Sequence, residues 1–186
     1  MKLLYNMFLL SLLFLCVLSF AEQANAGTAI APCAIYSKAD AAVLFQEEVS
    51  EGVPSETVAP AGRMCRYTFS KDGDVYSLKL RMSDDAMLKE EGIFDSVADI
   101  MARQKRARQN NENAAKEHEQ ITAFGDEAFW EGSSLWLRKG QTLVVVTVKA
   151  PLDGTFANRQ EADDAAKKQN RALSLNVAET ILSRLP

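Results

Sequence analysis

The chain has 186 residues, of which 47% are hydrophobic and 25% charged, and its formal net charge is −4. This length and balance fit one globular domain and exclude disordered and fibrous chains. The mildly acidic net charge argues against a general nucleic-acid binder, and one His with three Cys leaves too few ligands for the familiar zinc sites.

Residues 1–26 are typical of a secretory signal peptide. Lys2 precedes an apolar run from Met7 to Phe20, and Ala24-Asn25-Ala26 is a small-x-small sequence that a signal peptidase accepts. The run of about 14 residues is shorter than the roughly 20 that a membrane-spanning helix needs, so cleavage is favoured over a retained anchor. We therefore expect a periplasmic or secreted protein with a single domain at 27–186.

Two cysteines remain after cleavage, Cys33 and Cys65. An exported protein meets an oxidising compartment, where a disulfide is the default. The alternative is a redox pair, but redox dithiols usually lie close together as Cys-x-x-Cys. We predict a structural disulfide that closes a loop of about 33 residues and stabilises the fold by roughly 3–4 kcal/mol.

The first half predicts one helix and two strands. Ser37 is a suitable N-cap for a short helix ending near Phe45. Glycines and prolines between 52 and 62 predict a loop. Alternating apolar residues predict strands at 64–70 and 75–82, joined by a hairpin turn at residues 71–74, where an Asp-Gly pair tolerates positive φ.

The second half predicts a long helical stretch, three strands and a final helix. Ser83 is expected to cap the helical stretch, which turns polar beyond Arg103. The helix after the strands runs from about Asn158 to Arg184. Gly132-Ser133 and Lys139-Gly140 are the predicted turns between strands near 126–131, 134–138 and 142–149.

The predicted order is α-β-β-α-β-β-β-α. Short hairpins between neighbouring strands imply antiparallel pairing. Runs of strands punctuated by helices indicate the α+β class rather than a doubly wound sheet. We therefore expect an antiparallel sheet of about five strands flanked by helices.

The three-strand block has two apolar faces if both turns have two residues. Phe129 and Trp136 then oppose each other directly, and Glu127 and Arg138 are expected to be diagonal neighbours within reach of each other. The second face is either covered by a helix or the 109–124 loop, or it is exposed for a ligand or partner. Phe129, Trp136 and Arg138 are therefore candidate binding residues. The residues expected on the core face are Trp130, Leu135, Leu137, Val144, Val146 and Val148.

Few residues offer catalytic chemistry. His118 lies in a polar stretch and is interpreted as a surface residue. Adjacent or near-adjacent carboxylates could serve a hydrolase or a calcium site, but turns and helix starts account for most of them. No phosphate-binding loop or nucleophile elbow is found, and no cofactor or metal is expected. The carboxylate pairs are Asp72/Asp74, Asp84/Asp85, Glu90/Glu91 and Asp163/Asp164.

Four positive charges fall within six positions at 103–108. Such a cluster can attract an anionic lipid, a polysaccharide or nucleic acid. Nearby glutamates dilute the field, and no aromatic residue is interleaved to stack on bases. A solvated helix face is the alternative that we favour. The four residues are Arg103, Lys105, Arg106 and Arg108.

Three short motifs carry a resemblance to a known group. They are Cys33…Cys65-Arg66-Tyr67, Gly125-Asp126-Glu127-Ala128-Phe129 and Leu135-Trp136-Leu137-Arg138-Lys139-Gly140. With them the chain resembles a loose group of uncharacterised bacterial exported proteins and lipoproteins, and its element order is similar to the PsbP/Mog1-like α+β fold. The resemblance implies an extracytoplasmic accessory or binding role and assigns no functional residue. Bulky residues before Cys16 depart from the lipobox of the lipoprotein members.

The leading hypothesis is an exported periplasmic, non-enzymatic binding or accessory protein whose partner is a protein or a small ligand. The first alternative is a carboxylate-based periplasmic hydrolase, which needs two convergent acids, one with a raised pKa. The second is an envelope-surface interaction protein that uses the basic segment 103–108. No nucleic-acid partner is expected.

Overall fold

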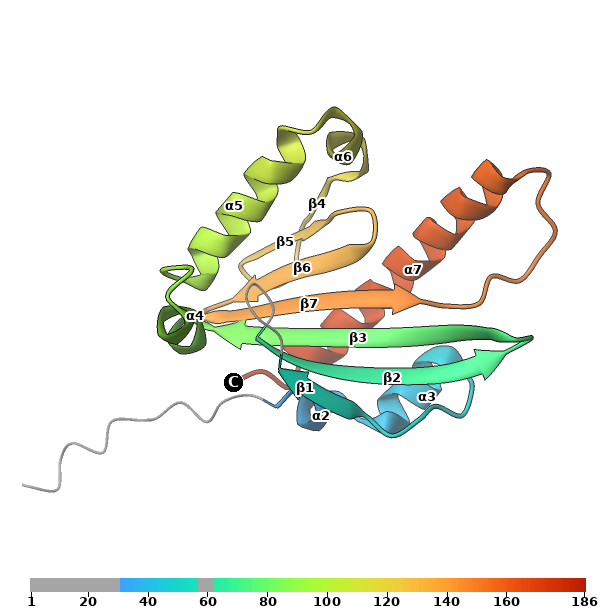
Figure 1. The fold of residues 1–186 in the computed structure, drawn as a ribbon, viewed down its shortest axis with the longest axis horizontal. Coiled ribbons are helices and arrows are strands. Elements are labelled where there is room, and N and C mark those ends of the chain that lie inside the picture. The colour runs from blue at the N-terminus through green and yellow to red at the C-terminus, as the bar shows by residue number, and fades with distance from the viewer. Residues whose placement is uncertain (1–30, 57–61) are drawn as a thin grey trace, which may run out of the picture.

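The computed structural model describes residues 31–56 and 62–186, so the predicted signal peptide at 1–26 lies outside the described residues. Seven strands form one sheet in the order β1-β2-β3-β7-β6-β5-β4, and every pairing between neighbouring strands is antiparallel (Figure 1). The strands are β1 (Val53–Glu56), β2 (Arg63–Lys71), β3 (Asp74–Asp84), β4 (Glu119–Ile121), β5 (Glu127–Trp130), β6 (Ser134–Lys139) and β7 (Thr142–Lys149).

Helices flank this sheet, which confirms the α+β class. The predicted order of elements and the predicted number of strands were wrong. Two extra strands and several short helices interrupt the expected sequence of elements. The helices of the described residues are α2 (Pro32–Ile35), α3 (Lys38–Phe45), α4 (Asp85–Glu91), α5 (Val97–Gln109), α6 (Glu112–Glu117) and α7 (Arg159–Leu182).

The two unexpected strands lie at the edges of the sheet. Strand β1 falls where Pro54 and neighbouring glycines predicted a loop, and it pairs with the start of β2. Proline lacks a backbone N–H, but an edge strand tolerates this because one of its sides has no ladder partner. Strand β4 has three residues and pairs with β5 from within the stretch that the sequence predicted to be polar and helical or frayed.

The long helical stretch predicted after Ser83 is also corrected. Ser83 belongs to β3, and the N-cap is Asp84, whose Oδ1 accepts a hydrogen bond from the Met87 backbone N–H at 2.9 Å. Helix α4 then ends at Glu91, and its C-cap Gly92 has a φ of 69°. A new helix, α5, begins after Ser96, which caps the Asp99 N–H. The left-handed backbone at Gly92 therefore splits the predicted helix in two.

Several local predictions are confirmed. Ser37 and Asp40 form a reciprocal capping box at the start of α3. The Asp72-Gly73 turn joins β2 to β3 with φ values of 55° and 86°. The predicted disulfide joins Cys33 of α2 to Cys65 of β2, and Cys65 is completely buried.

Each face of the sheet has its own apolar cluster. On one face α2, α3 and α7 pack against the strands, with residues such as Phe45, Leu80 and Ile181 at the centre. On the other face α4 and α5 cover the β5–β6–β7 part of the sheet. In Figure 1, α7 and α3 lie behind the strands, and no described helix lies in front of β2 and β3.

None of the helices within 31–56 and 62–186 is long and apolar enough to cross a bilayer.

Candidate functional site

The predicted aromatic pair on the second sheet face has the expected register. Phe129 pairs with Trp136 across β5 and β6, and their nearly parallel rings have centroids 6.0 Å apart. Both side chains are buried beneath α5, against Ile100 and Met101. Of the two alternatives, the structure therefore has the covered face. A ligand could reach these rings only by displacing α5, so their role in binding stays a prediction.

Two polar atoms next to this stack have no hydrogen-bond partner among the described residues. The His118 ring stacks on Phe129 with centroids 5.2 Å apart, so the predicted surface histidine is in fact half-buried. Its Nε2 and the Trp136 Nε1 are buried and unpartnered. A buried donor or acceptor without a hydrogen bond costs roughly 1–3 kcal/mol, so these atoms weaken the cluster that contains them.

Arg138 closes a hydrogen-bonded corner beside the stack. It is the direct cross-strand partner of Glu127, which corrects the predicted diagonal placement, because the register that pairs Phe129 with Trp136 also sets these two residues opposite each other. Its guanidinium lies 3.2 Å from Asp126 Oδ2. The same carboxylate oxygen accepts a hydrogen bond from the Gly140 N–H at 2.8 Å, and the Asp126 N–H donates to the Arg138 carbonyl. These bonds account for the Gly-Asp motif at Gly125 as a structural corner.

The basic residues of α5 are largely committed to intramolecular ion pairs. Arg103 pairs with Asp99 at 3.0 Å and also lies over the Phe94 ring. The next two pairs, which are Lys105–Glu127 at 3.5 Å and Arg108–Glu131 at 2.8 Å, tie α5 to the β5 region. The predicted cluster therefore anchors the helix, which reduces its capacity to attract an external anion.

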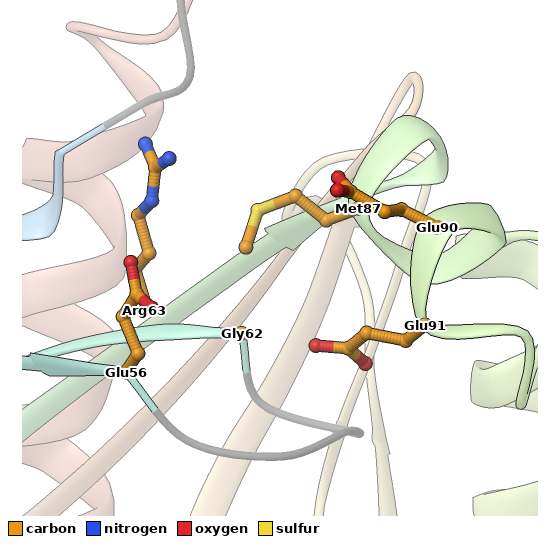
Figure 2. Close-up of a pocket in the computed structure, with 6 residues that line it drawn as sticks. All are labelled: Glu56, Gly62, Arg63, Met87, Glu90 and Glu91. Atoms are coloured by element: carbon orange, nitrogen blue, oxygen red, sulfur yellow. The ribbon is translucent and has the colours of Figure 1, made fainter.

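A hollow of about 400 Å³ lies between the paired ends of β1 and β2 and the helix α4 (Figure 2). Its size falls within the range of roughly 300–1,000 Å³ typical of small-molecule sites. We name it the charged hollow. It is lined by Glu56, Gly62, Arg63, Met87, Glu90 and Glu91.

Local backbone geometry places these residues. Gly62 has a φ of 56° and bridges to Met82, and a Cβ there would lie 2.5 Å from the Met82 carbonyl oxygen. Only glycine therefore lets the chain enter β2 so close to the end of β3. Glu56 and Arg63 are cross-strand partners. Figure 2 shows Arg63 extending from β2. It also shows the Met87 and Glu91 side chains pointing from α4 towards the side of the hollow that β1 and β2 form.

The four charged side chains of the hollow are uncommitted among the described residues. No ion pair within 4.0 Å and no side-chain hydrogen bond involves Glu56, Arg63, Glu90 or Glu91 in the described part of the chain. By contrast, each of the helices α5 and α7 has two basic residues in ion pairs with residues outside the helix, which are Lys105, Arg108, Lys167 and Arg171. Glu90 and Glu91 also lie in the last turn of α4, the negative end of the helix dipole. Three carboxylates against one guanidinium make the hollow acidic, which favours a cation.

A smaller hollow of about 250 Å³ adjoins this one through Glu56 and Arg63. Its other walls are mainly apolar and include Pro32, Cys33, Pro54 and Met64. Cys33 lines it from α2, which the disulfide holds against β2.

Carboxylate chemistry and metal binding find little support elsewhere. Hydrogen bonds from Arg184 hold the pKa of Asp40 well below its usual range, and those from Arg103 lower the pKa of Asp99. Both displacements are opposite to the raised pKa that a general acid needs. Within 31–56 and 62–186, no group of three or more His, Cys, Asp or Glu side chains is arranged to hold a metal ion.

Comparison of the chain with known protein families, with curated proteins and with solved structures finds no match. The resemblance to exported proteins and to the PsbP/Mog1-like fold therefore stays a prediction.

Sequence reasoning missed the charged hollow. Glu90 and Glu91 were noted as a carboxylate pair, but Glu56 and Arg63 fell in or beside a predicted loop. Their proximity depends on the pairing of β1 with β2, which no local pattern in the sequence indicates.

Proposed function

We propose that this chain is an exported, disulfide-stabilised binding protein that takes a small cationic ligand in the charged hollow. The observation that carries the proposal is the set of uncommitted charges around a hollow of ligand size. A cation in the hollow gains a charge-assisted hydrogen bond from the Glu90 or Glu91 carboxylate, neither of which makes one with the described residues.

The proposal includes export of the chain from the cytoplasm. The signal-like segment 1–26 and the Cys33–Cys65 disulfide support it, because disulfides persist in oxidising compartments. Intact-mass measurement of protein isolated from cells tests it: a chain starting at Gly27 and lacking free thiols is expected. A retained N-terminus or two free thiols would contradict export.

The binding experiment uses n-pentylamine and 1,5-diaminopentane as probes, with n-pentanol as the uncharged control. We expect the amines to bind with Kd on the order of 1 mM, as suits ligands of this size, and to shift the amide NMR signals of Gly62 and Glu91. The alcohol should cause no saturable shift.

A matched pair of variants locates the site. The double substitution Glu90→Gln/Glu91→Gln removes two charged acceptors and should raise Kd about tenfold or more. Glu179→Gln removes an exposed carboxylate from α7 and should change Kd less than twofold. Amine binding that is indifferent to the double substitution, or no saturable binding at all, would overturn the assignment.

The carboxylate-based hydrolase is the second candidate, because three carboxylates meet at one hollow. Turnover of chromogenic esters or glycosides that is lost in Glu90→Gln/Glu91→Gln would favour it. Amine binding without turnover of these substrates would favour the binding protein.

A further inference from the structure

Strands β2 and β3 carry basic residues on the face that α5 leaves uncovered. Tyr67, Leu78 and Leu80 point into the main apolar cluster. Side chains alternate along a strand, so Arg66, Lys79 and Arg81 point to the opposite side. We name the outward positions of β1, β2, β3 and the end of β7 the basic face.

The charges on this face are concentrated by the register. Arg66 and Lys79 are direct cross-strand partners, and Arg81 lies two positions along β3 from Lys79. Like charges directly opposite each other destabilise a sheet. An anion held between Arg66 and Lys79 would offset their repulsion.

No acidic residue occupies an outward position on these strands. The remaining outward residues of β2 and β3 are Met64, Thr68, Ser70, Val75, Ser77 and Ser83, of which Ser83 is buried, and those of the end of β7 are Thr147 and Lys149. No ion pair within 4.0 Å involves Arg66, Lys79 or Arg81 among the described residues, and the Arg81 Nε is buried without a hydrogen-bond partner. The basic face therefore stands out in a chain whose net charge is −4.

Two exposed valines lie on the same face. Val53 is 53% exposed and is the direct cross-strand partner of Arg66. Val75 lies at the N-terminal end of β3 and is 54% exposed. Aliphatic side chains beside cations suit a lipid surface, where the cations meet anionic headgroups and the aliphatic groups enter the interface. No aromatic residue occupies an outward position, so the face lacks the stacking platform typical of single-stranded nucleic-acid binders.

We propose that the basic face docks on a membrane surface rich in anionic phospholipid. This proposal is independent of the charged hollow. It also moves the predicted envelope contact from the ion-paired segment 103–108 to strands β2 and β3, in front of which no described helix lies.

The test is sedimentation with vesicles of phosphatidylcholine containing 30% phosphatidylglycerol, at low and high salt. The protein is purified in the form that cells accumulate, so that wild type and variants share one N-terminus. We expect wild type to bind these vesicles, to release in 0.5 M salt, and to ignore pure phosphatidylcholine.

Matched charge variants give the decisive comparison. Each interfacial Lys or Arg contributes about fivefold to partitioning, so Arg66→Gln/Lys79→Gln should weaken vesicle binding about 25-fold. Lys116→Gln/Lys168→Gln removes the same charge from exposed positions on α6 and α7 and should change binding less than twofold. Val53→Ser should weaken binding at low salt by a few fold. Thermal melts verify that each variant folds.

Three outcomes would overturn the proposal. One is vesicle binding that the Arg66/Lys79 double variant retains, and another is an equal loss in the Lys116/Lys168 control. The third is the absence of vesicle binding while a soluble anionic polymer such as heparin or single-stranded DNA is bound, which would assign the face to a polyanion.

Discussion

Replacing Trp136 tests the covered sheet face directly. Trp136 is 5% exposed and packs in the cluster formed with α5. A buried Trp removes roughly 150–250 Å² from water, which corresponds to about 4–6 kcal/mol at about 25 cal/mol per Å². Because neighbouring side chains relax into part of the cavity, we expect Trp136→Ala to lower the free energy of unfolding by about 3–5 kcal/mol.

Trp136→Phe should have a much smaller effect. The substitution keeps an aromatic ring next to Phe129 and leaves a smaller cavity, at a cost of roughly 1–2 kcal/mol. It also removes the buried Nε1–H that has no partner, a group whose burial costs roughly 1–3 kcal/mol. The two contributions nearly cancel, so we expect a stability within about 1 kcal/mol of wild type.

Urea unfolding followed by far-UV circular dichroism measures both variants, and in each of them the fluorescence reports on Trp130 alone. An unchanged m-value would show that the two states being compared are the same. If Trp136→Ala left stability unaltered, the burial of this face would be wrong. If Trp136→Phe cost as much as Trp136→Ala, the argument from the unpartnered donor would fail.

Two further perturbations probe other parts of the fold. Asp40 and Arg184 form a bidentate pair between α3 and the segment that follows α7, and Arg184 holds the pKa of Asp40 below its ordinary value of 3.8. Arg184→Gln should lower the melting temperature at neutral pH, and this difference should shrink as the pH falls below about 4, because the carboxyl group of Asp40 is protonated first in the unfolded state, where its pKa is not lowered. A difference in melting temperature that stayed constant from pH 7 to pH 2 would contradict this. Gly125→Ala should cost at least about 2 kcal/mol more than Gly140→Ala: both positions have a φ of +57°, but only at Gly125 would the Cβ lie 2.4 Å from the Arg138 carbonyl oxygen. Equal losses in a denaturant titration would show that the clash is relieved elsewhere.

Local chemistry made part of this fold predictable. Ser37 with Asp40 specified a helix start, and Asp72-Gly73 specified a hairpin, because each acts on its own neighbours. The opposition of Phe129 and Trp136 followed from the two-residue turn between their strands. Signals of this kind act within a few residues.

Features that depend on distant pairing could not be predicted in the same way. Strand β1 contains Pro54 and has no apolar alternation, and it forms because the start of β2 offers it a partner. The charged hollow depends on the same pairing, since Glu56 and Arg63 are brought together by it. To predict that α5 covers Phe129, one would have to know that α4 stops before Gly92 and that α5 returns over the sheet.

The attachment of the α5–α6 block has a consequence for motion. Besides its small apolar cluster, the block and the adjoining β4 are held by ion pairs to the β5 region and to α7, including Arg108–Glu131, Lys167–Glu117 and Arg171–Glu119. Salt weakens such pairs while leaving the apolar contacts across the other face nearly unchanged. Amide hydrogens of α5 should therefore exchange faster as ionic strength rises, whereas those of β3 and β7, which lie at the centre of the sheet, should keep their protection.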